Sequence, residues 1–319
     1  MPKRHILSIL DLEPAQVLYI VNRALEITRS QDEKRKPLEG KVVGVYFRKT
    51  STRTRSSFMV GAAKLGAIVV AYGPHDLQTN TGESIQDTAR VLANYLDVLV
   101  IRTAESLSEM KIIANQDHMS VINAMSDNEH PTQALADLMT IKEHFCRLDD
   151  INVLYLGEGN NTAAALALAI SRIQGMRLTM LTPEGYGLAH DVLDLSHEFA
   201  RKYNTVFEEH HSVEKLPKNV DVVYTTRWQT TGTSKKDPNW RERFKPFSVT
   251  KALMASVSKP SGTVFMHDLP AVREEDVSSD VLDGVQSIAF RQARNKLYSA
   301  MAALEWCVLG SRDTKIRIK

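Results

Sequence analysis

The sequence predicts an α/β protein with two doubly wound domains, each built on a central, mostly parallel sheet flanked by helices. Two observations favour this class. Short apolar runs rich in β-branched residues alternate along the chain with longer segments of helical periodicity. The 319 residues also suffice for two domains of about 150 residues each.

In the first half, strands are expected at short apolar runs such as Lys41–Phe47 (KVVGVYF). The further strands are expected at Ala67–Tyr72, Val98–Ile101 and Val121–Ala124. Helical spacing and suitable caps predict the intervening helices at Thr52–Leu65, Ser84–Tyr95 and Ser106–Asn115. A long helix is predicted at His130–Phe145, with Pro131 in its first turn, where a missing N–H costs little.

A second α/β series begins at Ile151. Its strands are expected at Asn152–Leu156, Arg177–Leu181, Thr205–Glu208, Val220–Thr225 and Thr263–His267. We therefore expect one domain over residues 1–145 and a second over residues 146–291. An amphipathic helix over about residues 292–310 is expected to pack back on the first domain.

Composition excludes several classes of partner. Lys and Arg total 40 against 38 Asp and Glu, and this balance argues against a nucleic-acid or membrane surface. Apolar runs are shorter than the roughly 20 residues of a membrane helix, and no signal peptide is evident, so we expect a cytoplasmic protein. The two cysteines, Cys146 and Cys307, provide neither a disulfide framework nor a zinc site. The histidines lack metal-ligand spacing, so no metal is expected.

One segment has the composition of an anion site. Residues 47–55 (FRKTSTRTR) follow a predicted strand and open a helix, where unpaired N–H groups and the helix dipole attract anions. Its hydroxyls and the guanidinium groups of Arg53 and Arg55 suit phosphate oxygens. The alternative is an ordinary Ser/Thr helix cap followed by solvated arginines. The position after a buried strand favours the anion site, because ligands bind at the carboxyl ends of parallel strands.

With these motifs the chain resembles the aspartate/ornithine carbamoyltransferase family. Ser51-Thr-Arg-Thr54 matches the family's Ser-x-Arg-Thr phosphate motif, and His130-Pro-Thr-Gln133 matches its His-Pro-x-Gln. Gly82–Leu92 and Val100–Thr103 are more similar to the ornithine branch. The order and spacing of these motifs extend the resemblance over nearly the whole chain.

The resemblance implies that the first domain binds carbamoyl phosphate. The phosphate would contact Ser51, Thr52, Arg53 and Thr54. Arg102, His130 and Gln133 match family residues that hold and polarise the carbamoyl group, a task suited to preorganised hydrogen-bond donors. The resemblance also implies a homotrimer with active sites at subunit interfaces, to which Gln78 would contribute from the neighbouring subunit. No cofactor is expected, because the donor is already activated.

The second domain would bind the amine. Gly157-Glu-Gly-Asn-Asn-Thr162 is a weak match to a dinucleotide loop, because Thr162 occupies the third glycine position. In the ornithine branch the corresponding Asn-Asn segment binds the amino acid, which implies that role for Asn161, with Asn160 as a possible second contact. The alternative is a pair of turn asparagines.

Three departures from the ornithine-branch pattern concern the acceptor. Its Asp-x-Trp-x-Ser-Met-Gly is Thr226-Arg-Trp-Gln-Thr-Thr-Gly232 here, with Thr230 replacing the serine. Its His-Cys-Leu-Pro is His267-Asp-Leu-Pro270, which puts Asp268 in the cysteine position beside Leu269. Its late arginine is Lys296, which lacks a guanidinium fork. We hypothesise that Asp268 orients or deprotonates the attacking amine.

The resemblance therefore implies carbamoyl transfer to a primary amine, with ornithine, giving citrulline, as the default acceptor. The alternatives are 2,3-diaminopropionate or putrescine, a catalytically silent relative, and an NAD-dependent oxidoreductase suggested by fold alone. The polar stretch Gln229–Trp240 is interpreted as a lid over the acceptor. The alternative is a solvated loop in which Lys235 and Lys236 are exposed.

Overall fold

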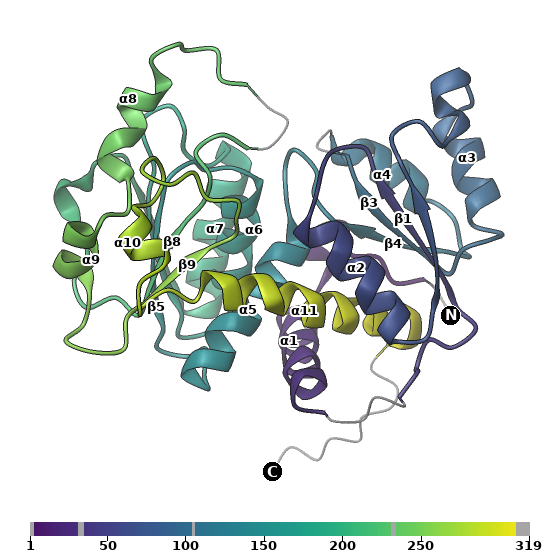
Figure 1. Ribbon diagram of the computed structural model, residues 1–319, viewed down its shortest axis with the longest axis horizontal. Helices are drawn as coiled ribbons and strands as arrows, with labels where there is room; N and C mark the ends of the chain where they lie inside the picture. The colour runs from purple at the N-terminus through teal and green to yellow at the C-terminus, as the bar shows by residue number, and fades with distance from the viewer. Residues whose placement is uncertain (1–2, 31–34, 104–105, 231–233, 311–319) are drawn as a thin grey trace. The chain divides into compact units, whose positions relative to one another are not determined.

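In the computed structural model the chain forms two compact units, each with its own parallel sheet (Figure 1). The structure describes residues 3–30, 35–103, 106–230 and 234–310. Unit 1 comprises Met1–Asp127 and Lys296–Lys319, and unit 2 comprises Asn128–Asn295. The division therefore falls inside the last helix, α11 (Ala289–Leu309). The predicted α/β class with two parallel sheets is confirmed.

Unit 1 contains a four-stranded sheet in the order β2-β1-β3-β4, with every pair parallel. Its strands are β1 (Val42–Phe47), β2 (Ile68–Tyr72), β3 (Val98–Arg102) and β4 (Ser120–Asn123). Its complete helices are α1 (Pro14–Arg29), α2 (Arg53–Lys64), α3 (Ile85–Leu92) and α4 (Leu107–Ala114), with 3-10 turns η1 (Ile9–Asp11) and η2 (Gln78–Thr81).

Strands β1, β3 and β4 of this sheet are almost entirely buried, whereas β2 at its edge is partly exposed. The helices α3 and α4 bury one face through Leu92, Met110 and Ile113. The helix α2 belongs to the β1–β2 crossover and packs against α11 (Figure 1). A Cβ at Gly61 would lie only 3.0 Å from Cγ of Met301, so glycine permits this close approach.

Unit 2 contains a five-stranded parallel sheet in the order β7-β6-β5-β8-β9. Its strands are β5 (Asn152–Leu156), β6 (Arg177–Leu181), β7 (Val206–His210), β8 (Val222–Thr225) and β9 (Val264–His267). Its helices are α5 (Pro131–Phe145), α6 (Asn161–Ile170), α7 (His190–Tyr203), α8 (Trp240–Phe244), α9 (Lys251–Val257) and α10 (Ser279–Leu282), with 3-10 turns η3 (Val213–Lys215) and η4 (Lys245–Phe247).

The helix α6 shows how composition sets the layers of unit 2. All ten of its residues (NTAAALALAI) are buried, as expected for a helix that is apolar on every side. The Asn160 side chain caps it by accepting the N–H groups of Thr162 and Ala163. The helices α9 and α10 contribute Leu253, Met254 and Val281 to a cluster that also contains residues of β5, β8 and β9.

Strand order puts a topological switch point in each sheet. In unit 1 it lies between β1 and β3, and in unit 2 between β5 and β8, because the chain proceeds from these strands in opposite directions across the sheet. Open α/β sheets bind ligands outside the carboxyl ends of the strands at such points. The polar motifs after these four strands are therefore the first place to look for a site.

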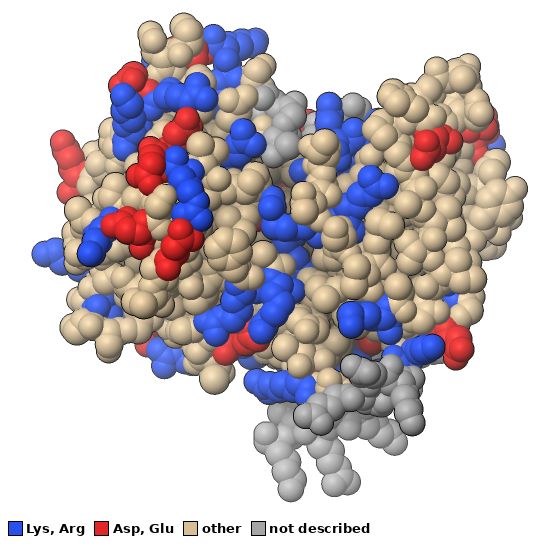
Figure 2. All heavy atoms as spheres, in the orientation of Figure 1, with Lys and Arg blue, Asp and Glu red and all other residues tan. Residues whose placement is uncertain are grey.

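Part of the surface of unit 2 carries charges of both signs. Acidic and basic side chains are mixed over α8, α9 and α10 on the face shown in Figure 2, in line with the formal net charge of +2. Among the helices described, none is long and apolar enough to cross a membrane.

Candidate functional site

The predicted phosphate segment lies at the carboxyl end of β1 and forms the start of α2. Thr52 is the N-cap residue of α2, yet its side chain makes no capping hydrogen bond. Instead, Ser51 Oγ accepts the backbone N–H of Arg55 at 3.3 Å. Thr54 is buried, while Arg53 and Arg55 are half-buried. The segment thus combines a helix N-terminus, hydroxyls and two guanidinium groups, the donors that a phosphate requires.

Arg102 ends β3, the strand that pairs with β1. Its Nη1 lies 3.5 Å from Ser51 Oγ, and its side chain is buried. Ser51, a predicted phosphate contact, and Arg102, the predicted carbamoyl contact of unit 1, therefore meet across the switch point. A buried guanidinium at this position provides a fixed positive charge, because arginine stays protonated throughout the working pH range.

The two other predicted residues of unit 1 lie on separate elements. Gln78 is exposed in η2, and its amide oxygen accepts the Thr81 hydroxyl at 2.6 Å within the same loop. Lys296 is buried on α11. The structure thus brings Ser51 and Arg102 together, and it ties Gln78 to its own loop.

In unit 2, the start of α5 and the start of α6 meet. His130 is the N-cap residue of α5, without a side-chain capping bond, and its backbone N–H donates to the carbonyl of Asn161 at 3.1 Å. The side chains of His130, Gln133 and Asn161 are all buried. The predicted carbamoyl residues His130 and Gln133 therefore lie beside a predicted acceptor residue.

A buried carboxylate fixes Gln133. Asp137 Oδ1 accepts Gln133 Nε2 and Gln292 Nε2, each at 2.7 Å, and Oδ2 accepts the Tyr224 hydroxyl at 2.9 Å. Burial raises the pKa of Asp137 to about 7, against the lowering effect of these hydrogen bonds. Since Nε2 of Gln133 donates to Asp137, the amide carbonyl oxygen points away from that carboxylate.

Asp137, Tyr224 and Gln292 were not predicted from the sequence. The helical spacing of Gln133 and Asp137, four residues apart, would have been enough to connect these two. By contrast, nothing in the sequence connects Tyr224 or Gln292 to a helix so distant along the chain.

Asp268 follows β9 and connects the ends of three strands. Its Oδ2 accepts the Thr162 hydroxyl at 3.0 Å, and its Oδ1 accepts the Thr226 hydroxyl at 2.9 Å. Thr162 is the second residue of α6, which follows β5, and Thr226 directly follows β8. Positions 226 and 268 are therefore in direct contact.

The loop that carries Asp268 and Leu269 is held by a buried histidine. His267 Nδ1 accepts the Leu269 N–H at 2.8 Å, so its proton lies on Nε2 and is donated to Asp276 at 2.7 Å. Asp276 also accepts the Val272 N–H at 2.9 Å. Leu269 has φ = +55° and precedes a cis proline. This network fixes the loop on both sides of Leu269.

Thr230 contacts the asparagine beside the predicted one. Asn160 Nδ2 donates to Thr230 Oγ1 at 3.2 Å, while Asn160 Oδ1 caps α6. Asn160 thus has the capping role of the alternative interpretation and also contacts a predicted acceptor residue. The backbone favours glycine at two nearby positions. Gly157 has φ = +126°, and a Cβ at Gly159 would lie 2.2 Å from the carbonyl carbon of Gly187.

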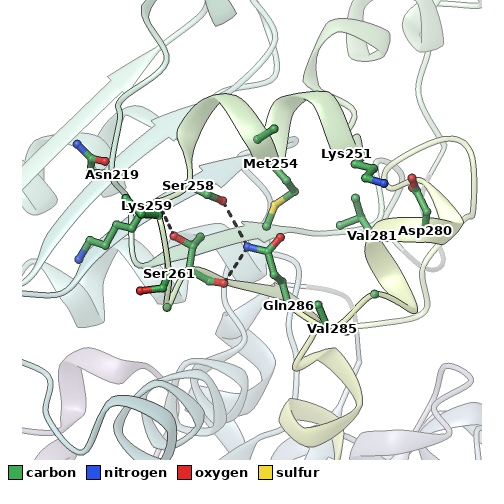
Figure 3. A pocket seen from close by; sticks show the side chains of 15 residues that line it. Asn219, Lys251, Met254, Ser258, Lys259, Ser261, Asp280, Val281, Val285 and Gln286 are labelled. Carbon is green, nitrogen blue, oxygen red and sulfur yellow. Dashed lines mark hydrogen bonds between the residues drawn. The ribbon is translucent and has the colours of Figure 1, made fainter.

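None of the predicted site residues is among those that line the following two cavities. One of about 820 Å³ in unit 2 is lined by α9, by the loop before β9, and by α10 with the residues that follow it (Figure 3). It therefore lies at the amino end of β9, away from Asp268. The other, of about 680 Å³ in unit 1, is lined by Arg48, Lys49 and residues of the segment 74–86. Within the described ranges, no three His, Cys, Asp or Glu side chains are grouped to hold a metal.

The fold defines an α/β protein with polar segments at the carboxyl ends of two parallel sheets, the place where open α/β sheets bind small ligands. Two family models match the chain: the aspartate/ornithine carbamoyltransferase carbamoyl-P binding domain over residues 4–143, and the Asp/Orn binding domain over residues 149–307. The chain belongs to the aspartate/ornithine carbamoyltransferase family.

Individual relatives agree with this assignment. An ornithine carbamoyltransferase of Caldicellulosiruptor saccharolyticus is 37% identical over 96% of this chain and 99% of its own length. One of Methanobrevibacter smithii is 36% identical over 94% of this chain and 98% of its own. The solved ornithine carbamoyltransferase from Pyrococcus furiosus superimposes with a TM-score of 0.90 at 36% identity, covering 97% of this chain and 98% of that one.

Proposed function

We propose that this protein transfers the carbamoyl group of carbamoyl phosphate to a primary amine, with ornithine as the default acceptor and citrulline as the product. The observation that carries the proposal is the contact between Ser51 and Arg102 at the switch point of unit 1. It joins the phosphate motif to a buried cation within the part of the chain that matches the carbamoyl-P binding domain. Relatives named ornithine carbamoyltransferase support the choice of acceptor.

We assign the phosphate to Ser51, Thr52, Arg53 and Thr54, with Arg102 directed at the carbamoyl oxygen. As the amine nitrogen bonds to the carbamoyl carbon, charge develops on that oxygen, and the C–O bond to phosphate then breaks with its electron pair leaving on phosphate. Donors fixed before the reaction stabilise this charge without reorganising. Arg53 and Arg55 also stabilise the phosphate that is released.

In unit 2 we assign the carbamoyl group to His130 and Gln133. The imidazole of His130 can donate to the carbamoyl oxygen. The amide oxygen of Gln133, directed away from Asp137, can accept from the carbamoyl NH2 group. The pair thereby recognises both ends of the carbamoyl amide.

We assign the acceptor to Asn161, Thr226, Thr230, Leu269 and Lys296, with Asp268 as the group that orients or deprotonates the amine. Thr226 and Asp268 are hydrogen-bonded, so a carboxylate at 268 occupies nearly the same region as one at 226 would. The negative charge available to an ammonium group thus lies at position 268 instead of position 226. This shift favours testing 2,3-diaminopropionate and putrescine beside ornithine.

The acceptor assignment is tested with Asp268→Asn, which keeps the shape of the side chain and removes its charge. We expect a loss of at least about tenfold in kcat/KM for the true acceptor, since a charge-assisted hydrogen bond contributes about 1.5–3 kcal/mol. Asp283→Asn, an exposed change in the same unit, is the matched control. Full activity of Asp268→Asn would exclude the proposed role.

We further propose a homotrimer in which Gln78 reaches the phosphate site of a neighbouring subunit. The exposure of Gln78 supports this, as do the exposed apolar side chains of unit 1, which include Val60, Ile68 and Tyr95. Light scattering should give three times the chain mass of 35.8 kDa. When the Gln78→Ala and Arg53→Ala proteins are mixed and allowed to exchange subunits, the mixture should regain activity that neither protein has alone. A mixture that stays inactive would contradict a shared site.

A further inference from the structure

The Lys235 side chain is enclosed although it belongs to a polar loop. Only 7% of the side chain is exposed. Its Nζ lies 4.8 Å from the ring centroid of Tyr186, 5.0 Å from that of Phe244 and 5.4 Å from that of Trp240. The same ammonium forms a salt bridge with Glu158. An ammonium removed from water requires such partners, because its desolvation is otherwise strongly unfavourable.

The walls of this enclosure come from separate parts of unit 2. Glu158 follows β5, Tyr186 follows β6, and Trp240 and Phe244 belong to α8. The rings also pack on one another, with centroids 4.9 Å apart for Tyr186 and Phe244 and 5.4 Å apart for Trp240 and Phe244. Faces of aromatic rings around one carboxylate form a cation-binding cage, the arrangement that proteins use to bind ammonium groups.

The cage is connected to the proposed acceptor residues through Glu158. Its Oε2 lies 3.4 Å from the Thr230 hydroxyl, and Thr230 also accepts from Asn160, the cap of α6. The carboxylate that binds the Lys235 ammonium therefore also contacts the loop residue assigned to the acceptor. Lys236, the next residue, is exposed.

We propose that Glu158, Tyr186, Trp240 and Phe244 form an ammonium-binding cage that is occupied by the chain's own Lys235, and that this occupancy positions Thr230 for the acceptor. Lys235 is a positioning residue, since it acts through Glu158. The positioning role rests on the proposed carbamoyl transfer, whereas the cage itself does not.

Occupancy of the cage is tested on the unaltered protein by lysine labelling. A short pulse of acetic anhydride, followed by chymotryptic digestion and mass spectrometry, gives the relative reactivities of Lys235 and Lys236. We expect Lys235 to react at least about tenfold more slowly in the native protein and equally fast in urea, because reaction requires the cage to open. Equal native reactivity of the two lysines would overturn the proposal.

The cage is tested separately with tetramethylammonium chloride, a cation that cannot be carbamoylated. In Lys235→Ala it should change tryptophan fluorescence saturably, because aromatic cages bind quaternary ammonium ions. In the unaltered protein and in Lys236→Ala the response should be absent. The same response in all three proteins would contradict a cage filled by Lys235.

The positioning role is tested by kinetics of Lys235→Met, with Lys236→Met as the matched control. We expect the KM for the acceptor to rise about fivefold or more in Lys235→Met, while the KM for carbamoyl phosphate stays unchanged. Tetramethylammonium should reverse part of the same KM increase in Lys235→Ala. Identical kinetics in Lys235→Met and Lys236→Met would refute the positioning role. An unaltered protein without carbamoyl transfer would refute the proposed function, while the labelling result would still decide the cage.

Discussion

The buried carboxyl of Asp137 makes the stability of unit 2 depend on pH in an unusual direction. Burial raises the pKa of Asp137 to about 7 in the folded protein, whereas the ordinary value is 3.8. Between these values the folded chain retains a proton that the unfolded chain releases. The stabilisation from this proton is fully present below about pH 4 and is lost as the pH rises through 7.

The size of the effect follows from the two pKa values. With pKa values of about 7 and 3.8, the stability loss between pH 5 and pH 8 is about 2.5 kcal/mol. Asp137→Asn removes the titration but keeps an oxygen that can accept from Gln133 and Gln292. The stability of the unaltered protein relative to Asp137→Asn should therefore fall by about 2.5 kcal/mol over this range.

Urea unfolding at several pH values measures this difference. In a Trp306→Phe background, fluorescence reports Trp228 and Trp240, which both belong to unit 2. Asp149→Asn, an exposed carboxylate in the same unit, is the control and should show no such trend. A difference between the unaltered protein and Asp137→Asn that stays constant, or that rises with pH, would refute the reasoning.

Three further changes test the packing and the anion site. Glu305→Ala should destabilise unit 1 by about 3 kcal/mol in urea unfolding, because it removes the carboxylate that lies 2.7 Å from the buried Arg23. An equal effect of Glu26→Ala, which removes a more exposed carboxylate, would contradict this. Gly159→Ala should cost about 3 kcal/mol or prevent folding, since its Cβ would overlap the backbone at Gly187, and an unchanged melting temperature would count against this geometry. Arg53→Met should weaken binding of inorganic phosphate about tenfold or more in calorimetry, and unchanged affinity would remove Arg53 from the anion site.

Much of the fold could be predicted because each buried parallel strand is a short apolar run. The run KVVGVYF marks β1, and Asn152–Leu156 and Arg177–Leu181 coincide with β5 and β6. Sequence periodicity does not contain strand order, so the switch points, and with them the meeting of Ser51 and Arg102, came from the structure. The helix α1 was not predicted.

The candidate site was only partly predictable, for a related reason. Motifs reveal residues that lie near each other along the chain, whereas Asp137, Tyr224 and Gln292 meet through the fold. Lys235 is another residue whose surroundings could not be predicted from the sequence. A lysine in a polar loop is expected to be solvated, as Lys236 is. The Lys235 side chain is buried only because three aromatic rings and Glu158 surround it.

The most direct test of the proposed function is a colorimetric assay for ureido product with carbamoyl phosphate and a panel of ornithine, 2,3-diaminopropionate, putrescine and aspartate. We predict a ureido product formed in equal amount with phosphate, with ornithine as the default acceptor, and its loss in folded Arg53→Ala and His130→Ala variants. Absence of product with every amine, or full turnover in both variants, would contradict carbamoyl transfer by these residues.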